Sequence, residues 1–260
     1  SGRVTGVQTC ALPISFNVEI FSMSSNLAEK LKKGTQKAHT MAENVGFVRC
    51  FLRGVVEKKS YRKLVANFYY VYTAMEEELE RHRDHPVVSS VYYPELYRKE
   101  TLETDLAFYY GPKWQDKISI SPAGQAYVDR IREVGNQSPE LLVGHSYTRY
   151  LGDLSGGQIL KNIAQRAMNL ADDEGVAFYE FPTISDEAEF KNRYRASIDA
   201  APVDDAMADR IVEEANDAFG TNMVLFQELE GNLVKAIGQM LFNSLTRGRR
   251  RGSTELATAE

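Results

Sequence analysis

Three glycines and one carboxylate lie within a segment that otherwise has the pattern of a continuous α-helix. The segment reads Tyr-Thr-Arg-Tyr-Leu-Gly-Asp-Leu-Ser-Gly-Gly and spans residues 147–157. Each glycine inside a helix costs about 1 kcal/mol relative to alanine, so the three together weaken the local helix preference by about 3 kcal/mol. Backbone without side chains permits close approach, which favours a helix lying against a flat ligand with Asp153 directed at its reactive centre. The alternative is a glycine-rich turn between two ordinary helices.

The residues on either side of the glycines favour one long helix that bends at them. Ser138 and Pro139 provide a helix N-cap and a first-turn proline. Apolar residues then continue at helical spacing on both sides of the glycines: Leu141, Leu142, Ile159, Leu160, Ile163, Ala164, Ala167 and Met168. Because no proline or polar cluster interrupts them, the pattern predicts a bend within a single element.

Segment 147–157 resembles the distal-helix signature of the haem oxygenase family. A second segment, Gly-Thr-Gln-Lys-Ala-His-Thr-Met-Ala-Glu-Asn at residues 34–44, is similar to the proximal segment of that family, whose histidine binds the haem iron. Two motifs in the right order are far more specific than either alone. The resemblance covers about residues 27–246 and is closest to the soluble enzymes of cyanobacteria and algae. It implies a single-domain, all-α, haem-oxygenase-like helical fold, with haem between a proximal helix and a bent, glycine-containing distal helix.

The first 22 residues have a different character. Val-Thr-Gly-Val-Gln-Thr-Cys-Ala-Leu-Pro-Ile at residues 4–14 resembles a read-through translation of a DNA-sequencing adapter. A signal peptide is the competing interpretation, but no uninterrupted apolar core follows Arg3. We expect residues 1–22 to be a non-native, disordered extension, residues 23–246 to form the haem oxygenase domain, and residues 247–260 to be a polar, basic tail.

Length and composition exclude several classes of protein. Residues 23–260 suffice for one domain with a large core. Cys50 is the one cysteine among them, which excludes disulfides and Cys-x-x-Cys metal sites and fits a reducing compartment. No apolar run reaches the roughly 18 residues that a membrane span requires. We therefore expect a soluble, cytoplasmic protein that spans no membrane and binds no nucleic acid.

Helical patterns extend over the rest of the chain, and no segment has a convincing strand pattern. Capping signals predict helix starts at Asn26, Ser60, Ser121 and Asp186. The last helical pattern runs from about residue 203 to residue 245, which exceeds the length of an ordinary globular helix. It therefore predicts a bend at Gly220 or Gly231.

The resemblance implies that His39 is the proximal ligand of the haem iron. Glu43 lies one helical turn later, where its carboxylate can orient or polarise the imidazole. A di-iron helical bundle is the alternative metal protein, but the paired Glu-x-x-His motifs that it needs are absent from the sequence. We expect His145, on the glycine-containing helix, to be a satisfied histidine of the core.

The resemblance also assigns roles on the distal side. Gly152 and Gly156 would let the helix backbone lie close to the distal face of the haem, and Gly157 extends the same segment. Asp153 would hold water that donates a proton to the bound oxygen, together with Tyr72, Arg149 and Tyr150. The alternative for these four side chains is ordinary helix packing with a surface ion pair.

Haem carries two propionates, which need cations or hydroxyls as partners. The family's propionate contacts match Lys32, Tyr147, Lys191 and Arg195. Lys191 and Arg195 are four residues apart on one helix, a spacing that suits a two-pronged contact with an anion. Gln36 departs from the mammalian pattern, which has lysine there, so anchoring is expected to be slightly weaker. Phe219 and Asn222 match residues that line the haem edge.

The implied activity is the oxidative cleavage of haem b, which is both substrate and cofactor. The products are biliverdin, carbon monoxide and ferrous iron, and the reaction uses O2 and electrons.

Residues 23–63 hold ten Lys or Arg and three Glu, whereas the whole chain has a net charge of −5. This asymmetry predicts a docking surface for an acidic electron donor, expected to be ferredoxin; a solvated basic helix face is the alternative. The expected downstream partner is a biliverdin reductase or a bilin reductase of phycobilin biosynthesis.

Two other functions remain open from the sequence. A haem-binding or haem-sensing protein without turnover would keep His39 but would not need Asp153. An all-α interaction scaffold would give no Soret band when haem is added, so a visible spectrum separates it from both haem proteins.

Overall fold

All regular secondary structure in the described residues is helical. The computed structural model describes residues 26–171 and 174–252. The α-helices are α1 (Leu27–Glu43), α2 (Gly46–Leu52), α3 (Lys58–Arg81), α4 (Lys99–Tyr110), α5 (Pro122–Gln137), α6 (Leu142–Met168), α7 (Glu187–Asp199) and α8 (Asp205–Gly252). Short 3-10 helices are η1 (Val88–Val91), η2 (Pro94–Leu96), η3 (Trp114–Lys117), η4 (Pro139–Leu141) and η5 (Ala177–Tyr179). No β-strand occurs in the two described ranges, so the all-α prediction is confirmed.

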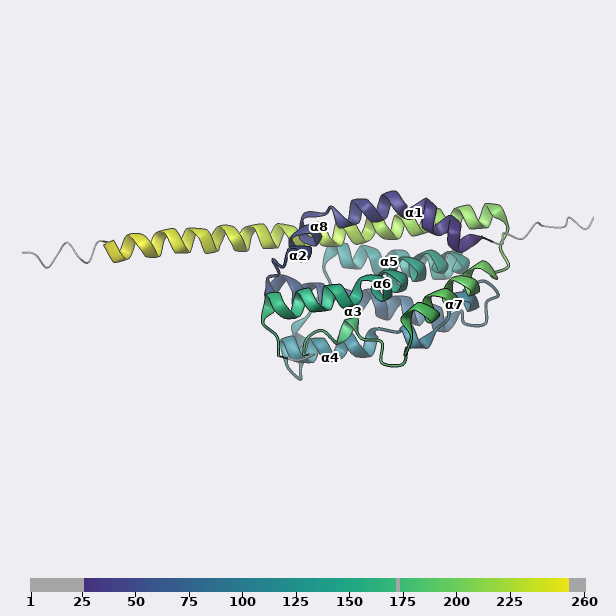
Figure 1. Ribbon diagram of the computed structural model, residues 1–260, viewed down its shortest axis with the longest axis horizontal. Helices are drawn as coiled ribbons and strands as arrows, with labels where there is room; N and C mark the ends of the chain where they lie inside the picture. Colours follow the sequence, from purple (N-terminus) through teal and green to yellow (C-terminus); the bar gives the residue numbers. More distant parts are fainter. Residues whose placement is uncertain (1–25, 172–173, 253–260) are drawn as a thin grey trace, which may run out of the picture.

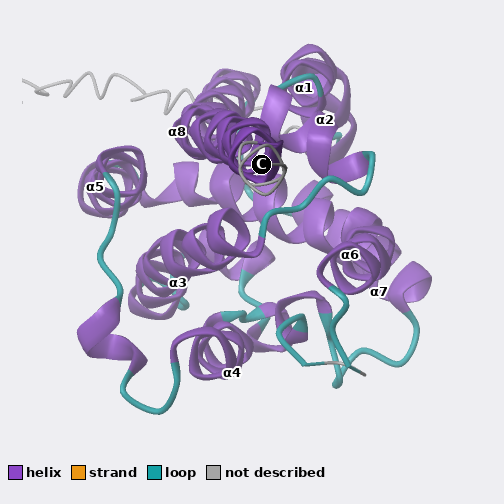
Figure 2. Ribbon diagram, turned by 90° about the vertical axis from the view of Figure 1, so that its left-hand side faces the viewer, coloured by secondary structure: helices purple, strands orange, loops and turns teal. Residues whose placement is uncertain are grey.

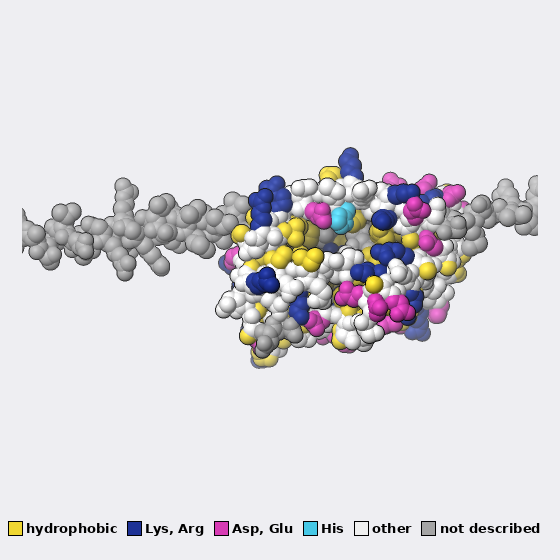
Figure 3. Space-filling view, viewed as in Figure 1, with side chains coloured by type: hydrophobic (Ala, Val, Ile, Leu, Met, Phe, Trp, Pro, Cys, Tyr) yellow, Lys and Arg dark blue, Asp and Glu magenta, His cyan; other side chains and the backbone are white. Residues whose placement is uncertain are grey.

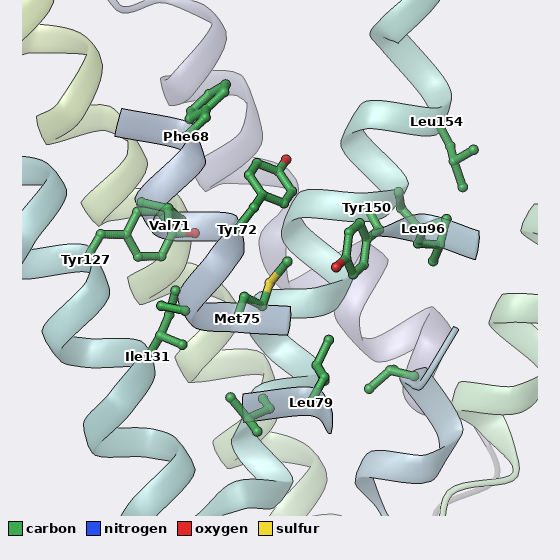
Figure 4. Close-up of a cluster of buried hydrophobic side chains, with 14 of the residues drawn as sticks. Phe68, Val71, Tyr72, Met75, Leu79, Leu96, Tyr127, Ile131, Tyr150 and Leu154 are labelled. Atoms are coloured by element: carbon green, nitrogen blue, oxygen red, sulfur yellow. The ribbon is translucent and has the colours of Figure 1, made fainter. Parts of the chain in front are cut away.

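Helix α3 lies at the centre of the molecule, with α4, α5, α6 and α8 around it (Figure 2). Its buried face carries the residues that the helical period indicates: Tyr61, Leu64, Val65, Phe68, Val71, Tyr72, Met75 and Leu79. Figure 4 shows this face between Tyr127 and Ile131 of α5 on one side and Tyr150 of α6 on the other. Each large apolar side chain buried here contributes about 1.5–3 kcal/mol, so packing on all sides fixes α3 in place.

Helix α8 packs against both α1 and α6 (Figure 1). Gly144 lets α6 approach α8 closely, because a Cβ atom there would lie 2.9 Å from the carbonyl oxygen of Ile211 and 2.9 Å from the amide nitrogen of Ala215. A side chain at this position would push the two backbones apart. The absence of a side chain at residue 144 therefore permits the close spacing of α6 and α8.

Helix α6 runs through the glycine segment without interruption, from Leu142 to Met168. A glycine-rich turn between two helices is therefore excluded. The helix begins later than the sequence indicates, because residues 139–141 form η4 and Ser138 makes no side-chain cap hydrogen bond. The Ser138 hydroxyl instead accepts a hydrogen bond from Nη2 of Arg210 on α8, at 3.1 Å.

Two of the other four predicted helix starts are confirmed. Ser121 caps α5 by accepting a hydrogen bond from the Gly124 amide, and Asp186 caps α7 through the amides of Ala188 and Glu189. Of the other two, the start at Asn26 is correct in position but lacks the side-chain cap bond, and the start at Ser60 is wrong. Ser60 lies inside α3, where Glu57 is the cap, and Asn26 forms no side-chain cap bond to α1. At the start of α1, the Ala28 amide donates to Asp199 of α7 at 2.8 Å, so a residue distant in sequence provides the acceptor.

Helix α8 is longer than the sequence pattern indicates and contains both Gly220 and Gly231. Figure 1 shows it as one continuous helix whose final turns extend beyond the other helices, and the bend stays a prediction. No helix within the described ranges is long and apolar enough to cross a membrane. The predicted extension at residues 1–22 and the last eight residues of the predicted tail lie outside those ranges.

Candidate functional site

Four polar side chains form a hydrogen-bonded group where α3, α6 and α8 meet. The Tyr72 hydroxyl donates to Oδ2 of Asp153, and Nε of Arg149 donates to the Tyr72 oxygen at 2.9 Å. Arg149 also donates through Nη1 to Oδ1 of Asn222 at 3.0 Å, while its Nη2 lies 3.7 Å from Oδ1 of Asp153. We call Tyr72, Arg149, Asp153 and Asn222 the Asp153 network. The buried side chains of Tyr72, Arg149 and Asn222 thereby position the carboxylate of Asp153.

Aromatic rings hold the guanidinium of Arg149 in this network. The guanidinium carbon lies 4.4 Å from the ring centroid of Phe68 and 5.0 Å from that of Tyr72. Phe178 of η5 packs against both rings, with centroid distances of 5.4 Å to Phe68 and 5.5 Å to Tyr72. Such contacts favour a cation that is shielded from water. The short η5 segment therefore forms part of the wall behind Asp153.

The Asp153 carboxyl group lies at the edge of the buried region, with 11% of its side chain exposed. Burial raises its pKa, and the charge of Arg149 and the hydrogen bond from Tyr72 offset only part of this effect. Burial also holds the pKa of Tyr72 well above its usual range, so that the phenol keeps the proton it donates. Asp153 is thus fixed by donors and takes up a proton more readily than an ordinary aspartate.

The glycines of α6 differ in what surrounds them. A Cβ atom built on Gly152 or on Gly156 meets no atom within 4 Å, whereas one on Gly144 would collide with the backbone of α8. At Gly157 a Cβ atom would make an ordinary contact with Tyr179, 3.7 Å away. Packing within the chain therefore explains Gly144 and gives no reason for Gly152 and Gly156. These two glycines leave open space beside Asp153.

His39 presents an exposed imidazole on α1, with 56% of its side chain accessible. Phe219 of α8 contacts the imidazole ring edge-on, with the centroids 5.8 Å apart. Oε1 of Glu43 lies 3.7 Å from Nδ1 of His39, which is too long for a hydrogen bond, so the carboxylate lies beside the ring without fixing it. Figure 3 shows an exposed histidine next to an acidic side chain, with hydrophobic side chains on one side and Lys or Arg on the other.

Helix α8 joins His39 to the Asp153 network. Phe219 contacts His39, and Asn222, three residues later on the same helix, accepts a hydrogen bond from Arg149. Both side chains are buried. The predicted proximal and distal residues are therefore connected through one turn of one helix.

A group of cations and hydroxyls lies where α1, α6 and α7 converge. Nζ of Lys191 lies 3.5 Å from the carbonyl oxygen of Leu154 on α6. Burial raises the pKa of Tyr147, against the opposing influences of Thr35 on α1 and of the positive charge of Arg195. Lys32 is exposed on α1, and no contact within the described part of the chain links it to the other three predicted propionate residues.

Comparison with known proteins identifies the family. The family model described as Heme oxygenase matches residues 25–228. The chain belongs to the haem oxygenase family. It is 69% identical over 238 residues to haem oxygenase 1 of Nostoc sp., which covers 92% of this chain and all of that protein. Human haem oxygenase 1 is 49% identical over 211 residues, covering 80% of this chain and 73% of the human protein.

A solved structure shows the same fold as this haem oxygenase family member. It is the crystal structure of haem oxygenase 1 from the cyanobacterium Synechocystis sp. in complex with haem. The match has a TM-score of 0.82 at 66% sequence identity and covers 85% of this chain and 99% of the solved one. The expected haem-oxygenase-like helical fold is confirmed.

The side chains of this haem oxygenase fit a haem group. An exposed imidazole is available to a metal on α1, and Gly152 and Gly156 leave room that nothing in the chain fills. Lys191, Arg195 and Tyr147 provide cationic and hydroxyl partners of the kind that carboxylates require. The chain thus offers an exposed imidazole, open space at two glycines, and cations and a hydroxyl, which is the chemistry that a haem group requires.

Three residues that the sequence analysis singled out lie outside the Asp153 network. Tyr150 is buried with its ring centroid 6.1 Å from that of Tyr72, but its hydroxyl has no hydrogen-bond partner among the described residues and does not join the Asp153 network. Gly157 packs against Tyr179. His145 is buried, and its Nε2 lies 2.9 Å from Oε1 of Glu214, which confirms it as a core histidine.

Two buried charged residues of this haem oxygenase were not predicted. Asp105 of α4 accepts hydrogen bonds from the amides of Ala177 and Phe178, at 2.8 and 2.9 Å. Arg98 donates to the carbonyl oxygens of Phe178, at 3.3 Å, and Glu180. Together they hold η5, and thereby the Phe178 ring, against the Asp153 network. Neither residue belongs to a recognisable sequence motif, since Arg98 lies just before α4 and Asp105 lies within it among other charged residues.

Proposed function

We propose that this protein catalyses the oxidative cleavage of haem b to biliverdin, carbon monoxide and ferrous iron. The observation that supports this most strongly is the open space at Gly152 and Gly156 beside a buried, donor-held Asp153. A haem-binding protein without turnover needs an iron ligand and a pocket, but it has no use for a positioned carboxyl group with a raised pKa.

His39 is proposed as the iron ligand on the α1 side. A neutral imidazole nitrogen is a common ligand of haem iron and leaves the opposite position free. When bound, haem supplies the metal that binds and activates O2 and the porphyrin that is cleaved. Phe219 contributes by holding the imidazole plane through its edge-on contact, since Glu43 is too distant to do so by hydrogen bonding.

The Asp153 network is proposed to deliver protons on the α6 side. Tyr72 and Arg149 fix the orientation of the Asp153 carboxyl group, and Asn222 fixes Arg149. The raised pKa suits a group that takes up a proton and passes it on through water. Tyr150 contributes its buried ring, which packs against Tyr72, and Gly157 continues the helix beyond the open space.

Lys32, Tyr147, Lys191 and Arg195 are proposed to bind the two propionates. Lys191 and Arg195 extend from α7 next to α6, so they can bind a carboxylate together. Lys32 approaches from α1, and Gln36, one turn later, provides an amide rather than a charge. Orientation of haem by these groups selects which meso carbon faces the Asp153 network.

The proposed electron donor is ferredoxin, which docks on the basic surface of residues 23–63. The support for this proposal is the excess of ten cations over three Glu in that segment, in a chain whose net charge is −5. Attraction between oppositely charged surfaces weakens as salt screens it over about 10 Å at 0.1 M. Ferredoxin-driven turnover should therefore fall with salt and with Lys37→Glu on exposed α1, while haem binding stays unchanged. Turnover that is insensitive to both would contradict this donor.

The test of the activity is a titration with haem followed by addition of a reducing system under air. We expect a Soret band on haem addition and then its replacement by the absorption of biliverdin, which a biliverdin or bilin reductase can consume. A Soret band without bilin formation would indicate a haem carrier. Absence of any Soret band would indicate an interaction scaffold.

A further inference from the structure

A cavity separate from the Asp153 network lies between the first turns of α3, the loop before α5, and α8. Its volume is about 400 Å³. Arg62, Lys63 and Lys117 provide three cations in its lining. None of the three forms an ion pair with any residue in the described ranges, and the buried Nε of Arg62 has no hydrogen-bond partner there. Three cations without an ion-pair partner in one cavity indicate a site for an anion, because like charges held close together repel one another.

Tyr110 holds two of these cations in place. The guanidinium carbon of Arg62 lies 5.1 Å from the Tyr110 ring centroid, and the Tyr110 hydroxyl donates to the backbone carbonyl of Arg62 at 3.3 Å. Nζ of Lys117 donates to the Tyr110 carbonyl at 2.5 Å, which leaves two of its three donors available. The cations are therefore oriented before any ligand arrives, which reduces the entropy lost on binding.

One carboxylate also lines the cavity, and it already has partners. Oε2 of Glu228 accepts hydrogen bonds from the Ser121 hydroxyl at 2.9 Å and the Ala123 amide at 3.0 Å, at the start of α5. Its charge leaves the lining with a net charge of +2. An anionic group is therefore directed to the Arg62 side of the cavity, away from Glu228.

We propose that this cavity binds a phosphate group, either as inorganic phosphate or on a small organic molecule. The charge of a phosphate dianion matches the net charge of the lining. A guanidinium can bind two phosphate oxygens side by side, and two ammonium groups can neutralise the remaining charge. The cavity is larger than a phosphate ion, so there is room for an organic substituent toward Ser119 and Ser121. This inference is independent of the haem reaction.

The test is calorimetric titration of the full chain at constant ionic strength, with inorganic phosphate in one arm and glycerol 3-phosphate in the other. We expect saturable binding at one site. The tighter-binding compound shows whether the phosphate is free or esterified. Arg62→Gln and Lys63→Gln should each weaken binding about tenfold, as expected for loss of one charge-assisted contact.

Lys113→Gln is the matched control, because Lys113 is an exposed lysine on the loop before η3 and lies outside the cavity. It should leave the affinity unchanged, and thermal unfolding of all three variants should match the parent. The proposal is overturned if phosphate shows no saturable binding. It is equally overturned if all three variants weaken binding to the same extent, because that result indicates a general charge effect. Since no step uses haem or a reductant, the outcome does not depend on the proposed cleavage of haem.

Discussion

The proposed roles of individual residues separate into binding haem and acting on it. Asp153 is held by Tyr72 and approached by Arg149, while His39 lies on a different helix. Asp153→Ala should therefore bind haem nearly as well as the parent but make biliverdin about 10² to 10⁴ times more slowly, because a positioned acid or base contributes that much. The Soret band measures binding and bilin absorbance measures turnover. Biliverdin formation at the parental rate would refute the role of Asp153, and Asp129→Ala on α5 provides a surface control.

Glycines of α6 provide a paired test of structure against function. Gly152→Ala should leave the fold intact or stabilise it by up to about 1 kcal/mol, because a Cβ there meets nothing and alanine favours helix. It should weaken haem binding by filling the open space. Gly144→Ala should instead destabilise the protein by about 1–3 kcal/mol, because its Cβ lies 2.9 Å from the α8 backbone. Thermal unfolding and haem titration of both variants distinguish the two kinds of glycine, and equal behaviour would contradict the distinction.

Sequence reasoning proposed His39 and Asp153 as site residues because each lies in a dense motif. It assigned Phe68 to the core alone, and it did not single out Phe178, Arg98 or Asp105. The contacts of these residues cross 70 or more positions in the chain, as in the Asp105–Phe178 hydrogen bond. Such pairings depend on how helices pack, and local periodicity carries no information about them.

Among the elements, η5 depends most on its neighbours. It is three residues long, and the Asp105 side chain satisfies the amides of Ala177 and Phe178. Asp105→Ala should destabilise the protein by about 1–3 kcal/mol for each buried amide left without an acceptor. It should also weaken haem binding, because Phe178 packs against Tyr72. Chemical denaturation and haem titration measure the two effects; Glu103→Ala on the same helix should show neither.

Helices were predictable where their ends or faces carry local signals. Ser121 and Asp186 cap their own helices, and the apolar stripe of α3 repeats with the helical period. Helices α2 and α4 were not predicted, because α2 has seven residues and α4 lacks a side-chain cap. The start of α1 was predicted at the right residue, but the side chain that accepts from its first turn, Asp199, comes from α7 and has no local signal.

Across the whole molecule, Glu214 ties α8 to α5 and α6. It lies 2.9 Å from His145 and accepts a hydrogen bond from Nε of Arg130 at 3.0 Å. Burial acts to raise its pKa, but the bonds from His145 and Arg130 prevail and lower it to about 2. Because the unfolded chain has the ordinary value of 4.5, this carboxylate stabilises the fold above pH 4.5, and the stabilisation is lost as the pH falls toward 2.

Glu214→Gln should therefore reduce stability at neutral pH and flatten its decline between pH 4.5 and 2. Denaturation midpoints across that range provide the measurement. Glu133→Gln serves as control, since Glu133 contacts Arg130 from a half-exposed position. A parent-like acid profile in Glu214→Gln would contradict this account.

The proposed domain bounds can be tested by removing residues 1–22. The family model begins its match at residue 25, and the whole Nostoc relative aligns with 238 residues of this chain. A variant that starts at Met23 should bind haem and turn over within a few-fold of the parent. Loss of either property would show that the segment contributes to the enzyme.

The position of Phe219 and Asn222 on one turn of α8 has a mechanical consequence. Phe219 contacts the imidazole of His39, and Asn222 accepts a hydrogen bond from the guanidinium of Arg149 in the Asp153 network. A small translation or rotation of α8 would therefore disturb both contacts at the same time. Opening of the proposed site to haem and disruption of the Asp153 network would then occur together. While the site is open enough to exchange haem, it would not consume oxygen and electrons.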